Sequence, residues 1–129
     1  MFTAKETETL QSHWLSRLAT VSSQGKPHLV PVAYAFDGSY FYASSDRGSR
    51  KLKNVAVNPN VCLLIDEHQN PRWGIMVEGQ ADLLSSGPDY IRAGKLLGHE
   101  LVGEHYMHAG HPQIIIRIKP ERKVSWGIE

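Results

Sequence analysis

Three runs rich in β-branched, aromatic and aliphatic residues follow one another near the N-terminus, separated by compact turn sequences. The runs are Leu15–Val21, Pro27–Phe36 and residues 40–43, and the second turn contains Asp37 and Gly38. An Asp-Gly pair between two such runs is a strong hairpin signal, because both residues tolerate the positive φ of a type I′ turn. We therefore predict a three-stranded antiparallel meander with a type I′ turn at this pair.

Four further segments carry a strand pattern, and three carry a helix pattern. The predicted strands are residues 61–65, Trp73–Leu84, residues 113–118 and residues 123–128, with a bulge at Gly79. The predicted helices are residues 4–11 with a capping box of Thr3 and Glu6, residues 49–57 with Ser49 as N-cap, and residues 88–97. Because strands do not alternate regularly with helices, we predict an antiparallel barrel of about seven strands with two or three short helices. The 129 residues suit a single domain spanning 1–129.

The overall charge is nearly balanced, with 14 basic and 13 acidic residues and a net charge of +1. Nucleic-acid and acidic-membrane binding need a strongly basic face, so neither partner is expected. The apolar runs are far shorter than the ~20 residues of a membrane span, and the N-terminus lacks a signal-peptide core, which favours a cytoplasmic protein. Cys62 lies within an apolar run, which is typical of a buried structural thiol.

Four of the basic residues gather within seven positions: Arg47, Arg50, Lys51 and Lys53. They lie where a strand turns through glycine into the helix predicted to begin at Ser49. Free amides, a hydroxyl and cations at a helix start can hold a phosphate group. The alternative is a solvated, basic helix start, but basic residues there oppose the helix dipole unless an anion compensates. The pattern therefore favours a phosphate site.

The second strand of the meander is apolar on both of its faces. Such a strand touches the core on one side and something else on the other, either a partner subunit or a bound planar ligand. Pro31 removes a backbone donor, which predicts a position at a sheet edge or a backbone left free for another partner.

Four histidines lie in a C-terminal stretch predicted to be irregular or to contain a helical turn: His99, His105, His108 and His111. Their spacing does not keep three imidazoles on one helix face, and the zincin pattern is absent, so no metal site is predicted. Neither a nucleophile elbow, a Walker loop nor a dinucleotide glycine motif occurs. If the protein is an enzyme, a cofactor is expected to supply the chemistry.

Several segments, in this order and spacing, resemble the pyridoxamine 5′-phosphate oxidase-like superfamily over roughly residues 14–128. They are Leu18-Ala19-Thr20-Val21, Gly25-Lys26-Pro27 through Val32, Phe41-Tyr42-Ala43 leading to Gly48-Ser49-Arg50-Lys51, Asn58-Pro59-Asn60-Val61, and Val77-Glu78-Gly79-Gln80-Ala81. The resemblance implies a flavin-binding split β-barrel, commonly a homodimer with the cofactor at the subunit interface.

The resemblance also implies roles for individual residues. It places Arg50 and Lys51 on the cofactor phosphate with Ser49 beside them, and Tyr42 and Ala43 along the ribityl chain. The ring would lie against the strand residues Val30, Pro31, Val32 and Ala33, and Trp126 would reach a flavin across the dimer interface. The alternative for Trp126 is a plain core or interface aromatic residue.

Three departures from the true oxidases make the name-giving reaction unexpected here. Ala35 and Gly74 replace a lysine and a flavin-contacting glutamine, and the chain ends at Glu129, before their substrate motif. The chain looks more like small branches that use FMN or the deazaflavin coenzyme F-420. No general acid or base is predicted firmly, although His28 and Tyr34 lie on the ring-facing strand.

The leading prediction is an FMN-dependent oxidoreductase that transfers a hydride to or from a small, planar molecule. The first alternative is a deazaflavin-dependent reductase. The others are a non-enzymatic flavin or haem binder, which would use a C-terminal histidine for haem, and an interaction module that retains only the barrel.

Overall fold

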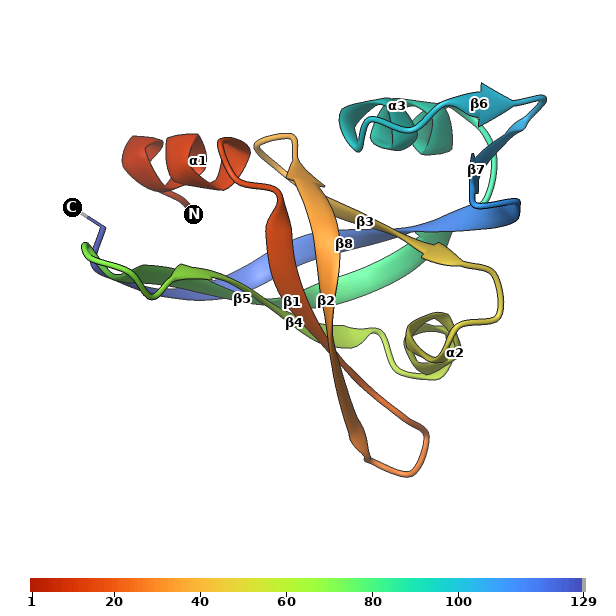
Figure 1. Ribbon diagram of the computed structural model, residues 1–129. Coiled ribbons are helices and arrows are strands. Elements are labelled where there is room, and N and C mark those ends of the chain that lie inside the picture. The colour runs from red at the N-terminus through yellow and green to blue at the C-terminus, as the bar shows by residue number, and fades with distance from the viewer. Residues whose placement is uncertain (129) are drawn as a thin grey trace.

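In the computed structural model, which describes residues 1–128, six antiparallel strands close into a barrel (Figure 1). The order around the barrel is β3-β2-β1-β4-β5-β8, and the pairing of β3 with β8 closes it. The strands are β1 (Leu15–Val21), β2 (Pro27–Phe36), β3 (Phe41–Asp46), β4 (Asn60–Glu67), β5 (Trp73–Leu84) and β8 (His111–Trp126). The predicted antiparallel barrel is confirmed.

Three helices and two short strands lie outside the barrel. They are α1 (Ala4–Gln11), α2 (Arg50–Val57), α3 (Pro88–Leu96), β6 (Leu101–Val102) and β7 (His105–His108). The predicted capping box is present in α1, where the Glu6 amide donates to the Thr3 hydroxyl and the Thr3 amide donates to the Glu6 carboxylate. Within residues 1–128, each helix is too short or too polar to cross a membrane.

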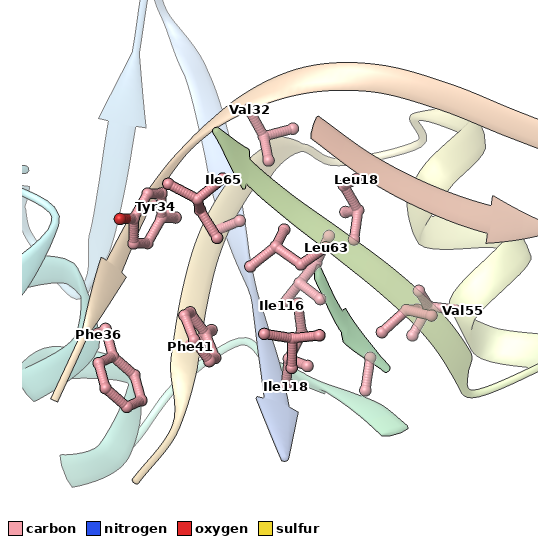
Figure 2. Close-up of a cluster of buried hydrophobic side chains, with 14 of the residues drawn as sticks. Leu18, Val32, Tyr34, Phe36, Phe41, Val55, Leu63, Ile65, Ile116 and Ile118 are labelled. Carbon is pink, nitrogen blue, oxygen red and sulfur yellow. The ribbon is translucent and has the colours of Figure 1, made fainter. Parts of the chain in front are cut away.

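The interior of the barrel is an apolar core to which β1–β5, β8, α1 and α2 all contribute. Figure 2 shows Phe41, Leu63 and Ile116 reaching this core from three different strands. Phe41 is fully buried, and its ring stacks on Phe36 at a centroid distance of 4.3 Å. Alternate residues of each strand face inward, which is why the period-2 sequence pattern predicts the core.

β2 changes partners along its length, and this change splits the barrel. Residues 27–33 pair only with β1, whereas residues 34–36 pair with β3. The backbone edge of the first part, opposite β1, is therefore open. Pro31 lies in this open part, as the sequence predicts, because a residue without an amide hydrogen costs no ladder bond at an edge.

The hairpin between β2 and β3 exists, but the predicted type I′ turn is wrong. Phe36 pairs with Phe41, so four residues form the loop, and only Gly38 has a positive φ, at 98°. Asp37 instead accepts hydrogen bonds from the amides of Ser39 and Tyr40 at 2.8 and 2.7 Å. The aspartate shapes the loop with its side chain rather than with a left-handed backbone.

The C-terminal region differs from the prediction, because β8 is one strand of 16 residues rather than two strands around Pro120. β5 pairs with both halves of β8, and the register shifts between Glu78 and Gly79, at the predicted bulge. Glu121 is the extra residue on the opposite strand. A side chain at Gly79 would collide with the Lys119 carbonyl, so the bulge requires glycine.

Residues 97–110 also differ from the prediction, since they contain β6 and β7 rather than an irregular or helical stretch. Together with α3 they form a unit, here called the cap, that packs on the barrel over a second core (Figure 1). This core contains Tyr42, Tyr90, Ala93, Tyr106 and Ile115. Tyr90 donates to the Gln113 carbonyl and accepts from the Tyr106 amide, both at 2.8 Å.

Candidate functional site

A cavity of about 420 Å³ lies where β2 and β3 diverge. Its first wall is the open part of β2, its second is the end of β3 with the start of α2, and its third is the cap with the start of β8. The lining residues are Pro31, Val32 and Ala33; Ser44, Ser45, Asp46, Ser49 and Lys51; and His99, His108 and Gln113.

The β2 wall is apolar, and one of its faces is uncovered. Alternate residues Leu29, Pro31 and Ala33 are exposed, and the Leu29 side chain is 65% accessible. Val32 faces the barrel core and is 7% accessible. An exposed apolar row on an otherwise folded strand marks a surface suited to a planar ligand or a protein partner.

The second wall carries one cation and several hydroxyl groups. Lys51 is partly buried, and this burial lowers its pKa, although nearby Asp46 acts in the opposite direction. Ser49 is the N-cap residue of α2, but its hydroxyl lies 2.6 Å from the Ser45 hydroxyl and does not cap the helix. The first turn of α2 contains no acidic residue. The wall therefore presents Lys51 and hydrogen-bond donors, which suit an anion, beside the Asp46 carboxylate.

The third wall contains two imidazoles. The His99 Nε2 atom lies 2.7 Å from the Ser44 hydroxyl, so the two side chains share a hydrogen bond. Burial, and then the charge of His108, lower the pKa of His99 below its usual value. Gln113 is buried and donates to the Asp46 carboxylate at 2.6 Å, which joins this wall to the second.

Four of the ten predicted cofactor residues lie on the open part of β2, and three of these four line the cavity. Pro31, Val32 and Ala33 do so, while Val30 is partly buried against the barrel core. Ser49 and Lys51 also line the cavity. Arg50 is exposed beside it, outside the lining set.

Tyr42 and Ala43, predicted along a ribityl chain, lie outside the cavity lining. Ala43 points into the barrel core, where it is 1% accessible. Tyr42 points into the second core and donates to the Asp37 carboxylate at 2.7 Å. The side chains that β3 does present to the cavity are the next ones along, Ser44 and Ser45.

Trp126 lies away from this cavity, near the end of β8. It pairs with Gly74 on β5, and a side chain at Gly74 would occupy the space of the Trp126 ring. This contact explains the glycine at a position where the resemblance leads us to expect glutamine. The Trp126 side chain is nevertheless 47% accessible, so one face remains free.

The two titratable residues singled out on β2 do not line the cavity. Tyr34 is buried and donates to the Leu10 carbonyl at 2.6 Å. His28 lies near the β1–β2 turn, with its Nδ1 atom buried and unpaired. The sequence predicts no metal site at His99 and His108 and offers surface, hydrogen-bonded or haem-binding roles for the C-terminal histidines, but it does not place them in this cavity. Within the part of the chain that the structure describes, no three His, Cys, Asp or Glu residues are grouped to hold a metal ion.

The split barrel with a hydroxyl- and lysine-lined cleft agrees with the result of a family comparison. The family model described as pyridoxamine 5′-phosphate oxidase matches residues 2–127. The chain belongs to this family. A reductase of 5a,11a-dehydrotetracycline and 5a,11a-dehydrooxytetracycline from Streptomyces rimosus is 35% identical over 136 aligned positions, which cover 99% of this chain and 84% of the relative.

Solved structures show the same fold. An F-420 reductase has a TM-score of 0.72 at 21% identity, covering 96% of this chain and 98% of its own. An FAD-binding protein from Mesorhizobium loti has a TM-score of 0.71 at 27% identity, covering 96% of this chain and 94% of its own. The proteins similar to this chain thus include two named as reductases and one named as an FAD-binding protein.

Proposed function

We propose that this protein is a flavin-type oxidoreductase that binds FMN in the cleft between β2 and β3 and reduces a small, planar molecule. The observation that carries the proposal is the pairing of two unlike walls around one cavity. An apolar, open strand edge at Pro31, Val32 and Ala33 faces a wall of serines and Lys51. A flavin mononucleotide has the matching parts, a flat apolar ring and a phosphate.

The phosphate end of the cleft is assigned to the start of α2. Lys51 supplies a charge whose partial burial strengthens its attraction to an anion. The Ser45 and Ser49 hydroxyls, which bond to one another, can turn to donate to phosphate oxygens. Exposed Arg50 is the second cation and reaches the same anion from the solvent side.

The ring end is assigned to β2. Pro31 and Ala33 offer a flat, exposed apolar surface, and the open backbone edge of β2 offers hydrogen-bonding groups to polar ring atoms. A bound reduced flavin supplies a hydride. The roles of the chain are to bind and orient the ring and to keep water from it.

The deazaflavin coenzyme F-420 is the second candidate cofactor. The fold similarity to an F-420 reductase supports it. The reductase name of the Streptomyces rimosus relative fits either cofactor. The relative also suggests a fused-ring substrate and the direction of reduction. The compound in the name of that relative, 5a,11a-dehydrotetracycline, is therefore the first substrate to test with this protein.

We also propose a homodimer in which Trp126 of one protomer reaches the cleft of the other. Trp126 is half exposed and lies away from the cleft of its own chain. Its ring packs directly against Gly74. The exposed apolar row of β2 gives the partner a surface to cover. Equilibrium sedimentation that finds only monomer at micromolar concentration would contradict this arrangement.

The cofactor assignment is tested by titrating the protein with FMN and with coenzyme F-420, following absorbance and fluorescence. Lys51→Ala is expected to weaken binding about 10–100-fold, as expected for the loss of one charge-assisted hydrogen bond, and exposed Arg50→Ala less. Lys119→Ala, a lysine on the far part of β8, is the matched control. Equal affinities for wild type and Lys51→Ala would overturn the phosphate assignment, and no binding of either compound would overturn the proposed function.

A further inference from the structure

The Ser44–His99 pair gives the cleft a titratable group that cofactor binding by itself does not require. Both side chains line the cavity, and they come from different parts of the molecule, β3 and the cap. Their hydrogen bond of 2.7 Å crosses 55 sequence positions. The contact therefore exists only because the cap packs against the barrel.

A reductase needs such a group when its substrate is a polarised double bond. A hydride brings two electrons and one hydrogen to one end of the bond, and a proton must then reach the other end. A positioned acid typically accelerates such a step by about 10²–10⁴-fold. Ser44 alone is a very weak acid, whereas a hydroxyl backed by an imidazolium can give up its proton and regain one at once.

We propose that Ser44 and His99 form a proton relay that protonates the substrate of the proposed reductase. The Ser44 hydroxyl gives its proton to the substrate atom next to the one that accepts the hydride. The His99 Nε2–H passes its proton to the Ser44 oxygen, which leaves a neutral imidazole and an intact hydroxyl. His99 regains a proton from solvent on the side of exposed His108. The relay rests on the proposed function and adds the proton source to it.

The surroundings of His99 suit a donor that releases its proton readily. Burial and the charge of His108 lower its pKa, so the protonated form is a stronger acid than a free imidazole. The other titratable or charged groups nearby are Asp46 and Lys51 in the cavity wall and Tyr106, whose ring centroid lies 6.0 Å from that of His99.

A double-mutant cycle tests the relay in the cofactor-loaded protein. The variants are His99→Gln, Ser44→Ala and the two combined, with 5a,11a-dehydrotetracycline as the probe and reduced FMN or reduced F-420 as the hydride source. Each single variant is expected to lower the single-turnover rate about 100-fold, and the double variant no further, because the two residues act as one unit. Each variant should still bind the cofactor, which a general collapse of the cleft would not allow. His68→Gln and Ser23→Ala, both exposed and outside the residues that line the cavity, are the matched controls.

The dependence of the single-turnover rate on pH shows which protonation state of His99 acts as the donor. Because the donor is the protonated imidazole, the wild-type rate should fall about tenfold per pH unit above the pKa of His99, and His99→Gln should lose this dependence. A readout without turnover is the His99 imidazole resonance in NMR. Its pKa should change in Ser44→Ala, and its chemical shift should change on addition of FMN or F-420, while the His68 resonance stays constant.

The outcomes separate the two proposals. Wild-type protein that binds neither cofactor overturns the proposed function and the relay together. Cofactor binding and reduction with an unchanged rate in His99→Gln overturn the relay alone, as does additive loss in the double variant. If the cofactor binds but the probe is not reduced, the reduction assignment fails, and a His99 resonance that ignores both the cofactor and Ser44→Ala then overturns the relay as well.

Discussion

The two cores of this protein are built from different side chains and are stabilised by different interactions. The barrel core is mostly aliphatic residues and phenylalanine, with Phe41 and Ile116 fully buried. The core beneath the cap depends on tyrosines, and the hydroxyls of Tyr90 and Tyr106 hydrogen-bond to backbone groups of α3, β7 and β8. Aliphatic packing stabilises without fixing direction, whereas hydrogen bonds specify orientation. The barrel therefore contributes most of the stability, and the cap sets the angle of the wall that carries His99 and His108.

The largest expected effect is in the barrel core. Phe41→Ala should lower the free energy of unfolding by about 3–5 kcal/mol, because a fully buried aromatic ring leaves a cavity. Val57→Ala, at the exposed end of α2, is the control and should change it by less than about 0.5 kcal/mol. Urea unfolding measures both variants. Similar losses for the two variants would contradict the division between a packed interior and the exposed surface.

The ion pair between Glu6 and Lys123 makes the free energy of unfolding depend on pH. Burial by itself would raise the pKa of Glu6, but the hydrogen bond from Lys123 and the Thr3 amide lower it from 4.5 to about 2. Stability from this carboxylate is complete above about pH 4.5 and is lost as the pH falls through about 2, a change of about 3 kcal/mol.

Urea midpoints between about pH 2 and pH 7 measure this effect. Glu6→Gln should be less stable than wild type at pH 7 and should lose most of the acid dependence in this window. The exposed Glu8→Gln should behave as wild type. Parallel pH curves for wild type and Glu6→Gln would rule out the ion pair as the cause.

In the cap core, Tyr90→Phe should cost about 1–3 kcal/mol, because it removes both hydrogen bonds of a buried hydroxyl. The loss should be local. Hydrogen exchange at Tyr106 and its neighbours should accelerate, while exchange in β4 and β5 changes little. Uniform acceleration over the whole chain would show instead that the cap and the barrel unfold as one unit.

The smallest expected change in stability comes from Gly94→Ala, yet it should move the cap. A side chain at Gly94 would collide with the buried Tyr106 ring, and such overpacking costs about 1–3 kcal/mol. Alanine recovers up to about 1 kcal/mol in a helix interior. We expect a net loss of up to about 2 kcal/mol, together with a shifted His99 environment in NMR spectra. Gly98→Ala is less suitable as a control, since Gly98 has φ 79°, so exposed Lys95→Ala on the same helix is used.

The sequence by itself determined the strands of the meander, the bulge at Gly79, the start of α2 and the family, because these depend on local periodicity, turn residues and short motifs. It did not determine that β8 runs through Pro120, since only the pairing with β5 holds both halves in one strand. Nor did it reveal that Ser44 meets His99. Two residues so far apart in the chain come within hydrogen-bonding distance only when the second core seats the cap on the barrel, and this packing is long-range.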